Sequence, residues 1–319
     1  MKLTNQRKSP PLENFPDVEG LPEFTVVVGE NGVGKTRLLL GIKSNDFSSD
    51  LFSNQLDSPP NFRREQVGVI YRDFTSIYNV ETRNNQTRSR MGINPNPTHD
   101  PFLINIFDRI QNWHTANDKN NFNRWTTTEG IEKREFLGKS EFTEIHGDDP
   151  ILEANKLLTL ANLPFKFDIT LSEETKHLDF YYQRLAQGSI SLRKVQVNGD
   201  FSSSFDPSQI SSGEKVLIAL ALLEMNSPHV GSVPPKLILL DEIDCVLHPA
   251  AIPQMFEVIR NVFIKEIGCH VILTTHSPTT VALADVHSLI LYEKRPTRSA
   301  PSDTAGCCKF TGKRCAARN

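Results

Sequence analysis

Short apolar runs with the length of β-strands alternate with helical stretches at the beginning of the chain and throughout its last third. The first run, residues 24–28, is β-branched and apolar on both faces, as a buried parallel strand is, and a helical start follows at 35–42. After Ile210, an apolar helix at 213–226 leads into strands at 236–240, 271–275 and 288–292, with helices at 251–265 and 278–284 between them. Strands that alternate with helices predict an α/β fold with a mostly parallel sheet flanked by helices.

The middle of the chain lacks this alternation. From about residue 75 to 150 it is polar, rich in asparagine and broken by prolines, with helical patches near 102–113 and 129–137, which predicts an inserted polar and helical lobe. Strand-like alternation returns at 165–169, 177–182 and 189–197, where the pair Asn198-Gly199 is a turn signal. These three runs predict a small antiparallel sheet.

Composition and charge exclude several classes of protein. The chain carries 35 Lys and Arg against 38 Asp and Glu, a net charge of −3, so no global positive field attracts a polyanion. No apolar run approaches the ~20 residues that a membrane helix needs, and the polar N-terminus has no signal-peptide core. We therefore expect a cytoplasmic protein that makes no contact with a membrane.

The last 24 residues, from Pro296 onward, differ from the rest of the chain: they are basic, hold three of the five cysteines and show no strand or helix periodicity. Three thiols without a paired histidine do not complete a tetrahedral zinc site. We expect residues 296–319 to form a disordered tail. Cys245 and Cys269 lie in apolar stretches, where we expect reduced thiols that act as small hydrophobic side chains.

A glycine-rich loop lies between the first strand and the first helix. Residues 29–36 match the pattern G-x-x-x-x-G-K-S/T, in which backbone N–H groups and a helix N-terminus cradle phosphates. We expect Lys35 to bridge the β- and γ-phosphates of ATP, and the Thr36 hydroxyl to ligate Mg²⁺. The predicted nucleotide-binding residues are Gly29, Glu30, Asn31, Gly32, Val33, Gly34, Lys35 and Thr36.

Two further apolar strands end in polar groups that suit the same chemistry. Asp241 and Glu242 follow the strand at 236–240, where paired carboxylates are costly without a cation. We expect Asp241 to hold Mg²⁺, and Glu242 to orient and deprotonate the attacking water. The strand at 271–275 is followed by His276, whose imidazole can donate to the γ-phosphate of ATP.

A Ser-Ser-Gly string opens the apolar helix that precedes the acidic strand. By itself such a string is a helix N-cap. After the glycine loop, and followed by the paired acids and the histidine, residues 210–215 resemble the signature motif of ABC-type ATPases in the variant form of the SMC-like and OLD-like branches. The resemblance implies that Ser211, Ser212 and Gly213 of one protomer close over ATP bound by the other, and that His276 is the switch histidine.

The resemblance covers residues 24–42 and 205–295 and implies a P-loop fold with an ABC-type ATPase head. The head would consist of residues 1–74, which include the glycine loop, and residues 165–295, which include the other motifs, with the lobe of residues 75–164 inserted and the tail of residues 296–319 appended. The string Leu247-His248-Pro249 is similar to OLD-like and related defence ATPases, and places His248 in a cross-dimer position. Arg72 and Asp73 stand where the family has a magnesium-sensing glutamine.

Among the soluble branches, the chain is most similar to the Septu-type ATPases of bacterial anti-phage systems, including those attached to retrons. The resemblance implies a homodimer of heads, or a higher oligomer, that sandwiches ATP, hydrolyses it to ADP and phosphate and controls a separate HNH-type nuclease. A truncated ATPase head of an OLD-like nuclease is one alternative, and a DNA-clamping repair or SMC-like ATPase is another. Residues of the lobe that could contact DNA are Arg83, Arg88, Arg90, Lys119, Arg124, Lys133 and Arg134, with Trp113 and Trp125 available for stacking.

Overall fold

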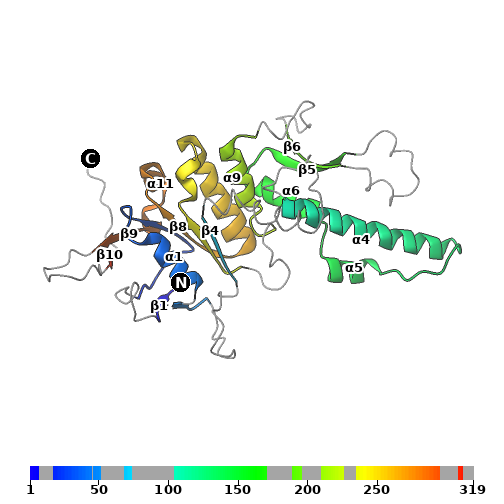
Figure 1. Ribbon diagram of the computed structural model, residues 1–319, viewed down its shortest axis with the longest axis horizontal. Coiled ribbons are helices and arrows are strands. Elements are labelled where there is room, and N and C mark those ends of the chain that lie inside the picture. Colours follow the sequence, from blue (N-terminus) through cyan, green and yellow to red (C-terminus); the bar gives the residue numbers. More distant parts are fainter. Residues whose placement is uncertain are drawn as a thin grey trace, which may run out of the picture. The chain divides into compact units, whose positions relative to one another are not determined.

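The computed structural model divides the chain into two compact units, one of residues Met1–Tyr78 and His229–Asn319 and one of residues Asn79–Pro228 (Figure 1). It describes residues 1–6, 17–44, 46–51, 68–73, 104–170, 189–195, 210–225, 235–294 and 308–311. The second unit extends further toward the C-terminus than the lobe of residues 75–164 that we predicted. It includes the small antiparallel sheet and the helix that follows the Ser-Ser-Gly string.

The first unit contains a six-stranded sheet in the order β10-β9-β2-β8-β7-β4 within the described part of the chain. Its strands are β2 (Phe24–Val28), β4 (Val69–Asp73), β7 (Leu237–Asp241), β8 (His270–Thr275), β9 (Leu289–Lys294) and β10 (Cys308–Thr311). Neighbouring strands are parallel except for β10 and β9. The prediction of an α/β fold with a mostly parallel sheet is therefore confirmed.

Strand β10 corrects the prediction that no strand follows residue 295. Cys308–Thr311 pairs antiparallel with β9, so that Cys308 lies opposite Lys294 and Thr311 opposite Leu291. Four residues are too few to give a recognisable period in the sequence, and the pairing depends on the free edge of β9. The rest of the predicted tail lies outside the described residues.

Helices cover both faces of this sheet. Helix α1 (Lys35–Lys43) places Leu38, Leu39 and Ile42 in a buried cluster with alternate residues of the strands and with the small antiparallel pair β1 (Leu3–Asn5) and β3 (Phe47–Ser49). On the opposite face, Phe24 of β2 packs edge-on against Phe256, with 5.6 Å between ring centroids. Alternation along each strand thus gives both helical layers an apolar surface.

Phe256 belongs to helix α10 (Ile252–Val258), which continues without a break as the π-helix η5 (Ile259–Ile267). The helix predicted at 251–265 is thus confirmed in place, although its second half has the wider π geometry. Three short helical segments, η3 (Ile243–Val246), η4 (Pro249–Ala251) and η6 (Val286–Ser288), and helix α11 (Pro278–Leu283) complete the described helices of this unit. None of the helices described in either unit combines the length and apolarity that crossing a membrane requires.

The second unit is built around a long helix. Its elements are α4 (Ile104–Thr128), α5 (Lys139–His146), α6 (Pro150–Leu160), the antiparallel pair β5 (Phe165–Thr170) and β6 (Ser189–Lys194), and α9 (Ser212–Ala221). Helix α6 begins where Asp149 caps it, because the Asp149 carboxylate accepts a hydrogen bond from the Ile151 N–H at 2.9 Å and Pro150 presets the first turn. Residues 177–182, predicted as a third strand, lie outside the described part.

The helix predicted at 129–137 is not formed. Helix α4 continues to Thr128 instead, and residues 131–138 return along it without helical structure (Figure 1). Polar side chains of α4 hold this segment: Asn120 bonds both the N–H and the carbonyl of Leu137, and the Thr127 hydroxyl bonds both backbone groups of Arg134. Because side chains satisfy these backbone groups, the local helical pattern does not decide the conformation.

A buried polar group lies inside this unit on α4. The side chain of Asp118 is 2% exposed, and neither of its carboxylate oxygens has a hydrogen-bond partner among the residues that the structure describes. His114, one turn earlier, places Nε2 3.4 Å from an oxygen of Asp149. Burial raises the pKa of Asp118 to about 7, although the nearby His114 opposes the shift. An ionised Asp118 therefore destabilises the unit.

We predict that Asp118→Asn stabilises the protein, most strongly above pH 7. The folded-state pKa of about 7 lies above the usual value of 3.8, so the carboxyl contribution to the free energy of unfolding falls as pH rises from about 4 to 7 and stays low above that. Thermal unfolding of both proteins between pH 4 and pH 8 measures this. The gain in melting temperature should be largest at pH 8 and shrink toward pH 4.

The exposed Asp148 provides the matched control, since Asp148→Asn makes the same charge change at the surface of the same unit. Its melting temperature should follow that of the wild type at every pH. If Asp118→Asn and the wild type gave parallel curves, the assignment of a buried, unsatisfied carboxylate would be wrong.

Candidate functional site

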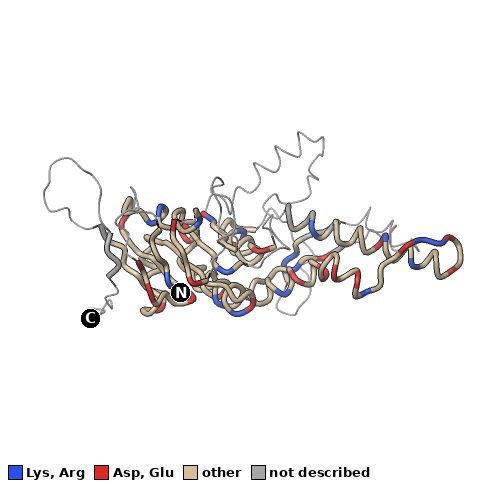
Figure 2. The backbone as a smooth tube through the Cα atoms, turned by 90° about the horizontal axis from the view of Figure 1, so that it is seen from below, with Lys and Arg blue, Asp and Glu red and all other residues tan. Residues whose placement is uncertain are grey.

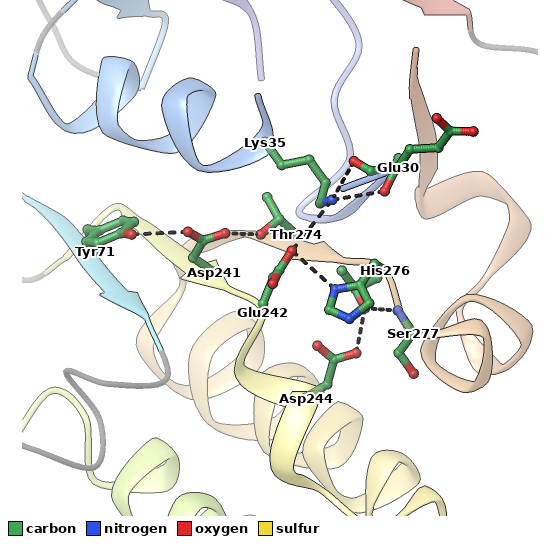
Figure 3. A network of polar contacts seen from close by, with 11 residues as sticks. Glu30, Lys35, Tyr71, Asp241, Glu242, Asp244, Thr274, His276 and Ser277 are labelled. Atoms are coloured by element: carbon green, nitrogen blue, oxygen red, sulfur yellow. Dashed lines mark hydrogen bonds and ion pairs between the residues drawn. The ribbon is translucent and has the colours of Figure 1, made fainter. Parts of the chain in front are cut away.

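The predicted chemical groups of the first unit meet at the carboxyl ends of its parallel strands. The register pairs Val28 of β2 with Thr275 of β8, and Asp241 of β7 with both Thr274 of β8 and Asp73 of β4. The glycine loop after β2, the acids at the end of β7 and His276 after β8 are therefore brought to one edge of the sheet, as Figure 3 shows. This is the edge at which open α/β sheets bind ligands.

The glycine loop is shaped by backbone requirements at its glycines. Gly32 and Gly34 have φ angles of 77° and 109°, which are strained for residues with a Cβ. Gly29 is required for a different reason: a Cβ there would lie 2.4 Å from the carbonyl oxygen of Tyr292 on β9. Because Gly34 is the N-cap of α1 and has no side chain, the first N–H groups of the helix keep their capacity to bind an anion.

Lys35 occupies the centre of the site. Its side chain is 4% exposed, and Nζ donates hydrogen bonds to the carbonyl oxygens of Gly29 at 2.9 Å and Glu30 at 3.2 Å. The same ammonium lies 3.5 Å from Oε1 of Glu242. The loop and the acid therefore share one buried positive charge (Figure 3).

Asp241 is held by neutral donors. Its carboxylate accepts a hydrogen bond from the Thr274 hydroxyl at 2.5 Å and another from the Tyr71 hydroxyl at 3.2 Å. Burial raises the pKa of Tyr71 well above its ordinary value, and the negative charges of Asp241 and Asp73 raise it further. Tyr71 consequently stays protonated and remains a donor, so the orientation of the Asp241 carboxylate is fixed from two sides.

Glu242 contacts two groups that can carry positive charge. Besides the ion pair with Lys35, its Oε1 lies 3.2 Å from Nδ1 of His276, whose side chain is 45% exposed. The backbone at Glu242 is left-handed, with φ 52°, and its N–H donates to the Thr274 carbonyl at 3.0 Å. This unusual conformation for a non-glycine residue turns the side chain away from the strand direction and toward the glycine loop.

Asp244 was not among the predicted site residues. It is buried in η3, and its Oδ2 accepts hydrogen bonds from the hydroxyl of Thr275, at 2.6 Å, and from that of Thr280. Thr274 and Tyr71 were also missed. Two signals in the sequence were available. One was the acid Asp244 inside the apolar string at 243–247, and the other was the pair of threonines that ends the apolar strand at 271–275. Buried polar groups of this kind need hydrogen-bond partners.

The Ser-Ser-Gly string belongs to the second unit and forms a complete N-cap. Ser211 and Glu214 make a capping box: the Ser211 hydroxyl accepts from the Glu214 N–H at 3.3 Å, and the Glu214 carboxylate accepts from the Ser211 N–H at 3.0 Å. Lys194 of β6 pairs with the same carboxylate at 3.3 Å. Ser212 and Gly213 form the first residues of α9.

Two further predictions concern His248 and the magnesium-sensing position. His248 is exposed, and its Nδ1 accepts a hydrogen bond from the Ala250 N–H at 3.2 Å, so it caps the short helix η4. Asp73 ends β4 beside Asp241, while Gln66 and the residues directly after Asp73 lie outside the described part of the chain.

The residues proposed to hold Mg²⁺ offer oxygen ligands of the kind it prefers. The hydroxyl of Thr36 is exposed on the first turn of α1, and the Asp241 carboxylate lies at the end of β7. No group of three or more His, Cys, Asp or Glu side chains in the described residues could hold a metal ion. Because Mg²⁺ keeps several waters and uses one or two protein ligands with substrate phosphates, these two oxygens fit it.

Comparison with protein families identified a match over most of the chain. A family model with the description "AAA domain, putative AbiEii toxin, Type IV TA system" matches residues 24–282. The matched segment extends from β2 through the glycine loop, the Ser-Ser-Gly string and the paired acids to α11 beyond His276. Comparison with curated proteins gave no match.

Three solved structures are among those to which this chain is similar. The Smc head domain of Pyrococcus furiosus with an extended coiled coil, bound to the C-terminal domain of ScpA, is 12% identical, with 91% of each chain covered and a TM-score of 0.38. The SmcHead bound to the C-winged helix domain of ScpA is 13% identical, with 97% of this chain and 96% of that chain covered and a TM-score of 0.39. The ADP conformation of an ATP-binding cassette of an ABC transporter is 15% identical, with 85% and 75% covered and a TM-score of 0.35.

We predict that Gly29→Ala destabilises the protein by about 1–3 kcal/mol, the range for overpacking at a site that cannot relax. The added methyl group would lie 2.4 Å from the Tyr292 carbonyl oxygen, which is backbone and cannot rotate away. Thermal or denaturant unfolding measures the loss. Gly138→Ala is the control, because that glycine has φ −64° and a methyl group added there would meet no atom within 4 Å. Equal stability of the two variants would contradict the close approach of β9 to the loop.

Proposed function

The chain belongs to the AAA-domain family described as putative AbiEii toxins of type IV toxin–antitoxin systems, and on that premise we propose that it is an ATP-hydrolysing regulatory subunit of an anti-phage defence complex. ATP binding and the P-loop ATPase class follow from the family and the fold. The observation that carries the proposal is the convergence of Lys35, Glu242 and His276 at the tip of the parallel sheet.

Nucleotide binding begins at the glycine loop and Lys35. The N–H groups of the loop and of the first turn of α1 would donate to phosphate oxygens. Lys35 Nζ donates to two carbonyl oxygens of the loop. Phosphate oxygens bound there would replace these carbonyls as acceptors, while the ammonium would remain between the loop and Glu242. Bound Mg²⁺, held by Thr36 and Asp241, would supply positive charge that stabilises the phosphate oxygens in the transition state.

Glu242 is the proposed general base. Its carboxylate would accept the proton of the attacking water, as the new bond from the water oxygen to the γ-phosphorus forms and the bond from the γ-phosphorus to the β–γ bridging oxygen breaks. His276 Nδ1 lies 3.2 Å from Glu242 Oε1 and its side chain is exposed, so the imidazole would hold the carboxylate in place and donate to a γ-phosphate oxygen. The products are ADP and inorganic phosphate.

We further propose that two copies sandwich ATP. In this arrangement Ser211, Ser212 and Gly213 of one copy would face the phosphates held by the other, with the capping box presenting the N-terminus of α9. Hydrolysis or loss of nucleotide would open the sandwich and change what an effector can do. By its resemblance to Septu-type ATPases, the chain would control a separate HNH-type nuclease as that effector.

The defence role rests on two sequence-level similarities. The family description refers to a toxin–antitoxin system, and residues 247–249 resemble those of OLD-like and related defence ATPases. Direct contact of the lobe with DNA is the weaker proposal. Residues 104–170 carry eleven Asp and Glu against eight Lys and Arg, and Figure 2 shows the two signs interleaved along α4 and α5. Trp113 is engaged within the lobe, since its Nε1 donates to the Gly147 carbonyl at 3.0 Å.

We predict that the wild-type protein hydrolyses ATP with Mg²⁺ and that Glu242→Gln lowers kcat by about 10²–10⁴-fold, the range for loss of a general base. Glu242→Gln should still bind ATP and should accumulate as an ATP-bound dimer, because the opening step is blocked. Steady-state hydrolysis and the mass in solution with and without ATP measure both effects. Lys35→Ala is the matched variant, and it should lose ATP binding itself. Failure of the wild type to bind or hydrolyse ATP would refute the proposal.

A second prediction addresses the defence role. Cells that carry this chain together with its neighbouring genes should show a reduced plating efficiency of sensitive phages, and Lys35→Ala or Glu242→Gln should restore plating by tenfold or more, because both stop the ATPase cycle. Plaque assays on matched strains measure this. Protection that survives both substitutions would separate the ATPase site from defence and overturn this part of the proposal.

A further inference from the structure

Two chain segments that are distant in sequence are joined at Asp244. One is η3, which begins directly after Glu242, and the other is the turn from β8 through His276 into α11. Asp244 is 4% exposed, and its Oδ2 accepts hydrogen bonds from the hydroxyls of Thr275 and Thr280. Thr275 immediately precedes His276, and Thr280 lies on α11, the helix that follows it.

The hydrogen bonds continue around His276. The Thr275 hydroxyl, which donates to Asp244, also accepts from the Ser277 N–H at 2.9 Å. The Ser277 hydroxyl in turn accepts from the Thr280 N–H at 3.3 Å and caps α11. The residues on both sides of His276 are thus tied to one buried carboxylate, while the imidazole between them is exposed.

A second link joins the same two segments at the surface, namely the contact of 3.2 Å between Glu242 Oε1 and His276 Nδ1. An exposed pair of this kind contributes little by itself, because solvent screens it and ordering the side chains has an entropic cost. Hydrogen bonds to a buried charged group are stronger and better defined. The buried link therefore sets the geometry at which the exposed one can form.

We propose that Asp244 is a positioning residue for ATP hydrolysis: through Thr275 and Thr280 it holds His276 at hydrogen-bond distance from Glu242. The inference rests on the proposed function, because it concerns how the base of that reaction is oriented. Asp244 contacts neither Lys35 nor the glycine loop by any hydrogen bond or ion pair found among the described residues. It should therefore affect turnover and leave nucleotide binding intact.

The test compares Asp244→Ala, Asp244→Asn and Thr280→Val with the wild type. Asp244→Ala should lower kcat by about 10–100-fold, a loss typical of misplacing a catalytic group, with the Kd for Mg·ATP changed by less than about threefold. Asp244→Asn keeps a carbonyl oxygen that can accept both hydroxyls and should keep kcat within about threefold. Thr280→Val removes one donor without changing the volume and should give an intermediate loss. Equal losses in kcat and ATP affinity would overturn the proposal.

The decisive comparison adds each change to His276→Ala. If Asp244 acts through His276, then Asp244→Ala has no further effect on kcat in the His276→Ala background, whereas independent or merely structural effects multiply. The proposal would be refuted if the losses in kcat of the two single variants multiplied in the double variant. It would also be refuted if Asp244→Ala lowered kcat strongly while His276→Ala did not. Thermal unfolding shows whether each variant is folded. If Asp244→Ala does not fold, Thr280→Val takes its place in the comparison.

A measurement without turnover separates this inference from the proposed function. The imidazole NMR signals of His276 in the nucleotide-free protein should shift toward those of an unconstrained histidine in Asp244→Ala and remain in place in Asp244→Asn. If the wild type does not hydrolyse ATP but His276 shifts in this way, the proposed function fails and the positioning stands. If hydrolysis is observed and His276 does not shift, the positioning fails and the proposed function stands.

Discussion

The parallel hydrogen-bond register of β2, β8 and β7 is the constraint on which the site depends. Parallel neighbours cannot be joined by a tight turn, so the chain must leave the sheet and return through long crossovers between strands. Asp241 is therefore more than two hundred residues from the glycine loop in sequence, although β7 and β2 each pair with β8. A shift of one residue in the pairing of β7 with β8 would move Thr274 away from Asp241, and a shift in the pairing of β2 with β8 would move the glycine loop relative to His276.

Three carboxylates within four residues would repel one another unless each had its own partners. Asp241 and Asp244 are buried and accept hydrogen bonds from hydroxyl groups, which hold their orientation without neutralising their charge. Glu242 lies between them in sequence and contacts an ammonium and an imidazole instead. The acidic string thus contains two carboxylates held by hydroxyl groups and one, that of Glu242, beside groups that can carry positive charge. Glu242 is the one for which we proposed the role of general base.

The sequence predicted the sheet and the main groups of the site because these features are local. Each strand is a short apolar run, the glycine loop has fixed spacing, and Asp241, Glu242 and His276 directly follow strands. The partners Tyr71, Thr274 and Thr280 could not be predicted, because they depend on which strands are neighbours and in which register. The helix expected at 129–137 failed for the opposite reason: Asn120 and Thr127 of α4 bind its backbone, and a local pattern cannot report such contacts. Asp118 gave no signal at all, since a lone acid on a helix normally faces water.

The left-handed backbone at Glu242 limits which residues can occupy this position over evolutionary time. With φ near 52°, β-branched side chains are strongly disfavoured, whereas glycine, asparagine and aspartate adopt this region more readily. If Glu242 is the general base as proposed, a lineage that lost hydrolysis but kept the fold would drift toward those small residues before it accepted valine or isoleucine. Glycine, asparagine or aspartate at position 242 of a relative would then indicate that the base has been lost while the left-handed turn has been kept.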